Sequence, residues 1–76
     1  MNLLAVFDIN EPERSTRLRE LRVAARLMLG PRHPVSVALA AAIADPEALA
    51  AAVEAIDGLP ALPRRRLLAT LASVLH

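Results

Sequence analysis

The chain has 76 residues, 55% of them apolar, and its nine Arg against eight acidic residues give a net charge of +1. A chain of this length forms one domain and buries only about 60% of the surface that it exposes when unfolded. With no cysteine and one aromatic residue, Phe7, the composition excludes a disulfide framework, a thiolate metal site, a second domain and a large catalytic cleft. The apolar content also excludes intrinsic disorder.

The basic residues are all arginine, and alanine is the commonest residue. This bias is typical of a GC-rich bacterial genome. The apolar start of the chain, residues 1–7, has no basic residue, so we expect no secretion signal. The longest apolar stretch, residues 37–44, is far shorter than the about 20 residues of a membrane span. We therefore expect a cytoplasmic protein that forms a single helical domain over residues 1–76.

Residues 1–10 form an apolar N-terminal arm whose structure the pattern leaves open. Leu3, Leu4 and Phe7 are spaced to share one side of a helical turn, but the alternation of apolar residues over 3–9 suits a strand equally well. Because every later segment favours helix, a strand here would have to pair with another copy of the chain.

The first clear helix is predicted at residues 11–29. Asn10 is a good N-cap and Glu13 lies three residues later, as in a capping box, with Pro12 in the first turn. Gly30, followed by proline, supplies a left-handed cap and a stop. The helix has one apolar stripe, formed by Leu18, Leu21, Ala25 and Met28.

Two short helices follow at residues 35–44 and 46–57. Asp45 is placed to cap the second of them, with Pro46 at its first position. A kink in one longer helix is the alternative, but Pro46 removes a helical hydrogen bond and disfavours helical geometry at Asp45, so we favour a turn. The expected buried positions are Val35, Leu39 and Ile43 in one helix and Leu49, Val53 and Ile56 in the other.

The last helix is predicted at residues 63–75, although either Pro60 or Pro63 could open it. Its apolar stripe consists of Leu67 or Leu68, Leu71, and Val74 or Leu75. The fold class is therefore all-α, a small bundle of about four short helices. Helices of about ten residues are marginal alone, and the two alanine-rich ones bury little area. Such a chain gains stability from a partner surface.

The sequence offers no catalytic or metal-binding constellation. His33 lies in a loop and His76 is the last residue, so three or four converging metal ligands are not expected. Ser36 is close to His33 but is expected to cap the helix that follows. Gly30 and Gly58 both end helices, which leaves no glycine-rich phosphate loop. We predict a protein that is not an enzyme and has no cofactor and no metal.

Two groups of arginines are candidate binding residues. Arg19, Arg22 and Arg26 are spaced to form one exposed stripe, and none has an acidic residue four positions away. Arg64, Arg65 and Arg66 occupy the first turn of the last helix, where the helix dipole favours anions. Either group could be an ordinary solvated face, with nearby acids such as those of residues 54–57 offsetting the second group. Either could instead meet an acidic protein or phosphate.

We therefore predict a small non-catalytic protein–protein interaction module, of adaptor, chaperone-like or regulatory type. It is expected to self-associate as a homodimer, or to bind a protein partner, through apolar residues of the arm, Leu3, Leu4 and Phe7. The alternative is a helical nucleic-acid-binding domain that uses the six arginines. The small net charge and the lack of stacking aromatics weigh against that alternative.

Overall fold

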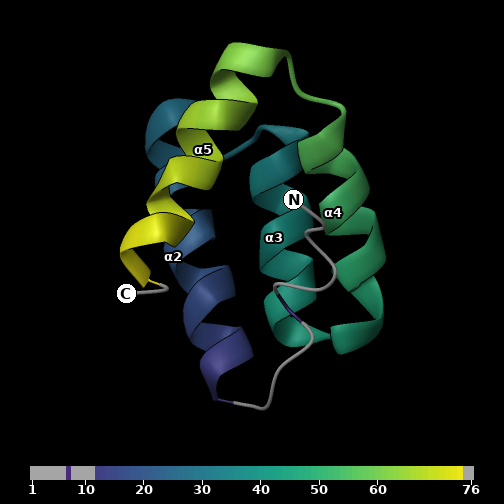
Figure 1. The fold of residues 1–76 in the computed structure, drawn as a ribbon. Coiled ribbons are helices and arrows are strands. Elements are labelled where there is room, and N and C mark those ends of the chain that lie inside the picture. Colours follow the sequence, from purple (N-terminus) through teal and green to yellow (C-terminus); the bar gives the residue numbers. More distant parts are fainter. Residues whose placement is uncertain (1–6, 8–11, 75–76) are drawn as a thin grey trace.

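The computed structural model describes Phe7 and residues 12–74 of the chain. Within these residues it is an all-α bundle with no strand, so the predicted fold class is confirmed (Figure 1). Its elements are α2 (Glu13–Met28), α3 (Pro34–Ala44), a single 3₁₀ turn η1 (Pro46–Ala48), α4 (Leu49–Asp57) and α5 (Ala61–Val74). Whether the N-terminal arm is helix or strand lies outside the described residues.

Helix α2 begins two residues later than predicted. Pro12 occupies the N-cap position without a side-chain cap, and its carbonyl accepts the Thr16 N–H at 3.0 Å. Pro12 has a φ of −89° and a ψ of 2°, so the helix proper begins with the residue after it. The capping box expected from Asn10 therefore does not match the observed start, and Asn10 itself is outside the described residues.

The end of α2 follows the prediction. Leu29 is the C-cap, and Gly30 after it has a φ of +101°, the left-handed conformation that glycine adopts most readily. The N–H groups of Leu29 and Gly30 donate to the carbonyls of Ala25 and Arg26 at 2.7 and 3.1 Å. These bonds use carbonyls that the end of the helix leaves unpaired.

Helix α3 is capped by His33, where we expected Ser36 to cap it. The His33 Nδ1 atom accepts the backbone N–H of Val35 at 3.1 Å, and Pro34 fills the first helical position. Ser36 lies in the first turn of α3, is buried, and donates its hydroxyl to the Gly30 carbonyl at 2.8 Å. Ser36 therefore fastens the α2–α3 loop to α3.

The break after α3 is a turn, as predicted. Asp45 has extended backbone geometry, and its Oδ1 atom accepts the Glu47 N–H at 3.0 Å, with Pro46 between them. The third predicted helix is thus divided into η1 and α4. The last helix begins at Ala61, directly after Pro60, so the earlier of the two prolines opens it and Pro63 lies within its first turn.

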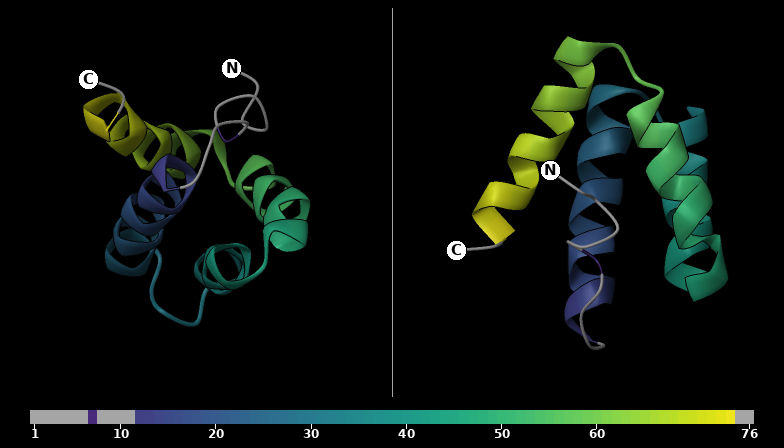
Figure 2. Two further views of the ribbon diagram at one scale, coloured as in Figure 1. Left: turned by 90° about the horizontal axis from the view of Figure 1, so that it is seen from below. Right: turned by 45° about the vertical axis from the view of Figure 1, so that its right-hand side comes forward.

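The helices form an arc in the order α5, α2, α3, α4 (Figure 2, left). Helix α2 packs against both α3 and α5, and α3 packs against α4. All four contribute to one hydrophobic core, which also contains Phe7. The largest of the fully buried core side chains are Phe7, Leu18, Leu21, Val35, Leu39, Ile56, Leu67 and Leu71.

The predicted apolar stripes agree with this core at most positions. The exceptions lie at the ends of the stripes, where Ile43 and Leu49 are only partly buried and Met28 is exposed. Met28 is in the last turn of α2, where it lines an open groove between α2 and the start of α5. A helical period therefore predicts which side of α2 is buried, but not how far along the helix its neighbours cover it.

The two glycines make a matched test of backbone conformation. We expect Gly30→Ala to lower the free energy of unfolding by about 1–2 kcal/mol, because its positive φ is strained for alanine although nothing lies within 4 Å of an added Cβ. Gly58 has a φ of −78°, and an added Cβ meets only ordinary contacts. Gly58→Ala is expected to raise stability by about 0.4–1 kcal/mol. Urea unfolding at one protein concentration measures both, and equal effects would contradict this account.

Candidate interaction site

Five large apolar side chains of the described residues are exposed, and they mark the candidate binding surfaces: Val23, Leu27, Met28, Val37 and Leu62. Isolated exposed apolar residues are normal, whereas grouped ones mark interaction sites. We divide them into two groups: one is exposed on the sides of α2 and α3 that face away from the core, and the other, Met28 and Leu62, lines a groove between α2 and α5.

The first group belongs to what we call the outer face: Val23 and Leu27 of α2 with Val37, Ala41 and Ala44 of α3. These positions lie on the sides of the two helices that point away from the shared core. Leu27 is 83% exposed and Val37 is 56% exposed. Helix α3 has no charged residue in its 11 positions, and its one polar side chain, Ser36, is buried. The exposed side of α3 is therefore entirely apolar.

A shallow depression extends the outer face at the α2–α3 loop. Val23 and Leu27 line it together with Arg26 and Pro31, and its volume is about 320 Å³. Pro31 belongs to the loop that leads directly into α3. The apolar surface of α2 thus continues to the start of α3, with Arg26 as the one charged residue on its lining.

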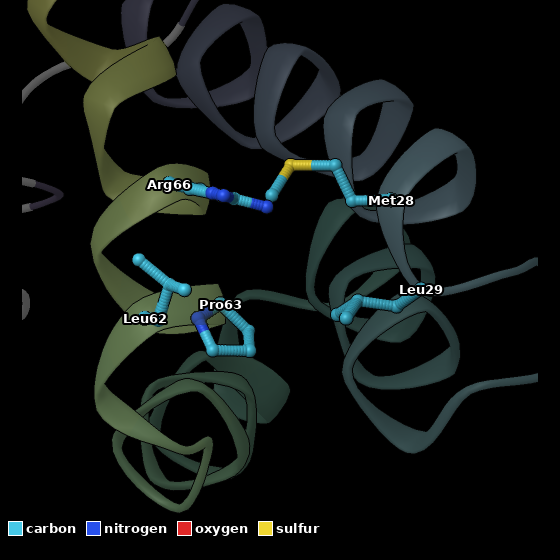
Figure 3. Close-up of a pocket in the computed structure, with 5 residues that line it drawn as sticks. All are labelled: Met28, Leu29, Leu62, Pro63 and Arg66. Carbon is cyan, nitrogen blue, oxygen red and sulfur yellow. The ribbon is translucent and has the colours of Figure 1, made fainter.

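The second group lies in a groove between the end of α2 and the start of α5, which we call the α2–α5 groove (Figure 3). It has a volume of about 430 Å³ and is lined by Met28, Leu29, Leu62, Pro63 and Arg66. The Arg66 side chain extends from α5 toward Met28 on the opposite wall (Figure 3). The groove is open to solvent and combines an apolar lining with a single cation.

The three arginines at the start of α5 do not form one patch. Arg64 donates to the backbone carbonyl of Asp57 at 3.1 Å, at the end of α4, whereas Arg66 reaches the α2–α5 groove. Successive residues of a helix project about 100° apart, and Arg65 between them is exposed. We expected nearby carboxylates to offset the positive charge of this group. Instead, a main-chain carbonyl accepts a hydrogen bond from Arg64. No described carboxylate pairs with Arg65 or Arg66.

The predicted stripe on α2 is only partly exposed. Arg19 and Arg26 are exposed, but Arg22 is half-buried, and its Nε atom is buried without a hydrogen-bond partner. Arg22 lies four residues after Leu18, so the two share nearly the same side of the helix, at the margin of the core. The expectation of one fully exposed stripe is wrong at this position.

One arginine of each group reaches a depression beside α2, and the two depressions lie on different sides of that helix. Arg26 lines the depression of the outer face, whereas Arg66 meets Met28 in the α2–α5 groove. Arg26 and Met28 are two residues apart, which places them on nearly opposite sides of the helix. The six arginines therefore do not combine into a single anion-binding surface.

Phe7, the described residue of the predicted apolar site, is in the core. Its side chain is 1% exposed, and its backbone carbonyl accepts the Arg14 Nε–H at 2.9 Å. It is therefore not available to a partner in this structure. Leu3 and Leu4, the other two residues of that site, lie outside the described residues.

The polar residues near the α2–α3 loop have structural roles. His33 and Ser36 are engaged with the backbone, as the helix cap and the loop fastening described above. Among the described residues no group of three His, Cys, Asp or Glu side chains could hold a metal ion. None of the described helices has both the length and the apolar character to cross a membrane.

Val23, Leu27 and Val37 were missed by sequence reasoning, although the signal was present. Val23 and Leu27 are four residues apart, on the side of α2 opposite the predicted stripe. The predicted apolar stripe of α3 did not include Val37. The opposite side of that helix has no charged residue either. A helix that is apolar on every side needs a cover on every side, which the sequence alone could have indicated.

Comparison with protein-family models, with curated proteins and with solved structures gives no match for this chain.

The position of Phe7 can be tested by its effect on stability. We expect Phe7→Ala to lower the free energy of unfolding by about 3–5 kcal/mol, the usual cost of truncating a buried phenylalanine. Leu62→Ala, at a position that is 55% exposed, should change it by less than about 0.5 kcal/mol. Chemical unfolding followed by circular dichroism measures both. A Phe7 variant as stable as the Leu62 variant would show that Phe7 is not a core residue.

Proposed function

We propose that this chain is a small non-catalytic protein–protein interaction module that self-associates through the outer face of α2 and α3. The observation that carries the proposal is the composition of α3. Its exposed side presents Val37, Ala41 and Ala44 to solvent with no charged residue on the helix. Surface helices normally have a polar face toward water. An apolar face in its place supports a buried position in an assembly.

The size of the chain supports the same proposal. Its accessible surface is 4804 Å², and a stable interface buries about 800 Å² on each partner, roughly one sixth of that area. Covering Leu27, which is 83% exposed, together with Val37 would add buried apolar area that a 76-residue core lacks. Association would therefore stabilise the fold as well as serve as its function.

The non-catalytic part of the proposal follows from the residues themselves. The sequence has no thiol and two histidines, and the imidazole of His33 already serves as a helix cap. A nucleophile needs a base within hydrogen-bond distance, and the nearby hydroxyl of Ser36 is directed to a main-chain carbonyl. From the bias toward alanine and arginine we propose a bacterial origin, and for the location we keep the cytoplasm that the sequence analysis predicts.

Binding of nucleic acid is the second candidate, favoured by one observation. Arg65 and Arg66 make no ion pair with a described carboxylate, so both charges are available to phosphate. Against this candidate, Arg26 and Arg66 lie on different sides of α2 and the net charge is +1. A phosphate-driven complex would lose affinity steeply as salt rises, whereas an apolar self-association would not.

A matched pair of charge insertions tests the proposed surface. Val37 and Leu62 are 56% and 55% exposed, on the outer face and in the α2–α5 groove respectively. We expect Val37→Glu to raise the dissociation constant of the dimer about 100-fold or more, because association would bury an unpaired carboxylate. Leu62→Glu introduces the same charge outside the interface and should leave the constant within about threefold.

Light scattering from micromolar to millimolar concentration, at low and moderate salt, measures both variants and the parent chain. A parent chain that stays monomeric throughout would overturn the proposal. Dissociation by Leu62→Glu alone would assign the interface to the α2–α5 groove. Circular dichroism of each variant distinguishes loss of association from loss of folding.

A further inference from the structure

We infer that the second copy docks in the opposite direction, so that α3 of one chain packs antiparallel against α3 of the other about a two-fold axis. This inference rests on the proposed function, because it requires self-association through the outer face. It adds the orientation of the two chains and the charged residues that fix it. Closed two-fold dimers are the commonest assembly of identical chains, and each residue then meets its partner position twice.

The charges that border α3 have opposite signs. Arg32 lies in the loop just before the helix, and Asp45 and Glu47 follow its end. All three are exposed, and no described residue pairs with the Arg32 guanidinium or the Glu47 carboxylate. The Asp45 Oδ1 atom accepts the Glu47 N–H, which holds that carboxylate at the turn, whereas the Glu47 carboxylate has no such bond.

An antiparallel pair brings these opposite charges together. Helix α3 is 11 residues long, or about 16 Å. The register that sets Val37 of one copy beside Ala44 of the other puts Ala41 near the two-fold axis. It also brings Arg32 of each copy within reach of Glu47 of the other. Two equivalent ion pairs then flank an apolar centre, which is the usual arrangement of a polar rim around an interface core.

A parallel pair has the opposite consequence. Arg32 would lie beside Arg32 of the second copy, and the two acidic ends of α3 would also meet. Like charges placed together across an interface disfavour that arrangement. The alanines of the exposed side allow the two helix axes to approach closely in either direction, so the bordering charges are what select the antiparallel one.

Charge reversal at the two borders tests the orientation. We expect Arg32→Glu alone and Glu47→Arg alone each to raise the dimer dissociation constant about tenfold at low salt, because each places like charges together twice. The double variant, with the charges exchanged, should return to within about threefold of the parent chain. Neither substitution removes the cap of η1, since the Asp45 carboxylate and the Glu47 N–H both remain.

Each reversal has a matched control elsewhere on the chain. Arg65→Glu on α5 changes the net charge as Arg32→Glu does, and Glu54→Arg on α4 changes it as Glu47→Arg does. Arg65 and Glu54 are exposed and lie outside the outer face. Their variants should dimerise as the parent does, which separates a contact across the interface from a general effect of net charge.

Cysteine cross-linking gives a second readout that does not depend on charge, since the chain has no cysteine of its own. In the antiparallel register a mixture of Val37→Cys and Ala44→Cys chains forms a disulfide under mild oxidation. Either variant alone does not, because identical positions are offset by about 10 Å along the helices. A disulfide within the Val37→Cys variant alone would overturn the antiparallel orientation and indicate the parallel one.

The outcomes separate the two proposals. If the parent chain is monomeric at every concentration, the proposed self-association fails. Suppose instead that the parent chain dimerises and Val37→Glu dissociates the dimer. If the single charge reversals then dimerise as well as their controls, or if they weaken the dimer and the double variant does not restore it, the antiparallel orientation alone fails. Loss in both reversals, rescue in the double variant and the mixed disulfide together support the inference.

Discussion

The packing of one side of α2 against both α3 and α5 is the interaction on which the rest of the structure depends. Leu18, Leu21 and Ala25 supply that side, and all three are buried. Because both neighbours pack against the same side of α2, residues at the edge of that side are only partly covered. Arg22 at one margin is half-buried. Met28, near the end of the buried side, opens into the α2–α5 groove.

Helix α3 shows how a small domain can be both well packed and incomplete. On its inner side Leu39 is fully buried. Its two ends are fixed by the caps at His33 and Asp45. Its outer side has the same apolar character without a covering element. Alanine suits both roles, since it favours helix and lets another helix approach closely. The proposed self-association is the completion of this packing by a second copy.

The arginines illustrate the difference between a cluster in sequence and a cluster in space. Arg64 and Arg66 are two residues apart but turn to different neighbours, the end of α4 and the wall of the α2–α5 groove. Arg64 offsets the unfavourable position of a cation at a helix start by reaching the negative end of another helix. Its charge therefore has a role within the fold, which weakens the argument for a dedicated phosphate site.

The sequence by itself determined the all-α fold, the break at Asp45, the left-handed cap at Gly30 and most of the buried positions. These depend on local rules, namely the helical period, the fixed φ of proline and the conformational freedom of glycine. The start of α2 lies two residues later than the capping signal of Asn10 predicts, with Pro12 at the N-cap position. Only the tertiary structure decided that Phe7 joins the core and that Leu27 and Val37 remain uncovered. It also decided that Arg26 and Arg66 lie on different sides of α2. Those outcomes depend on which helices become neighbours, and a period along one helix does not specify its neighbours.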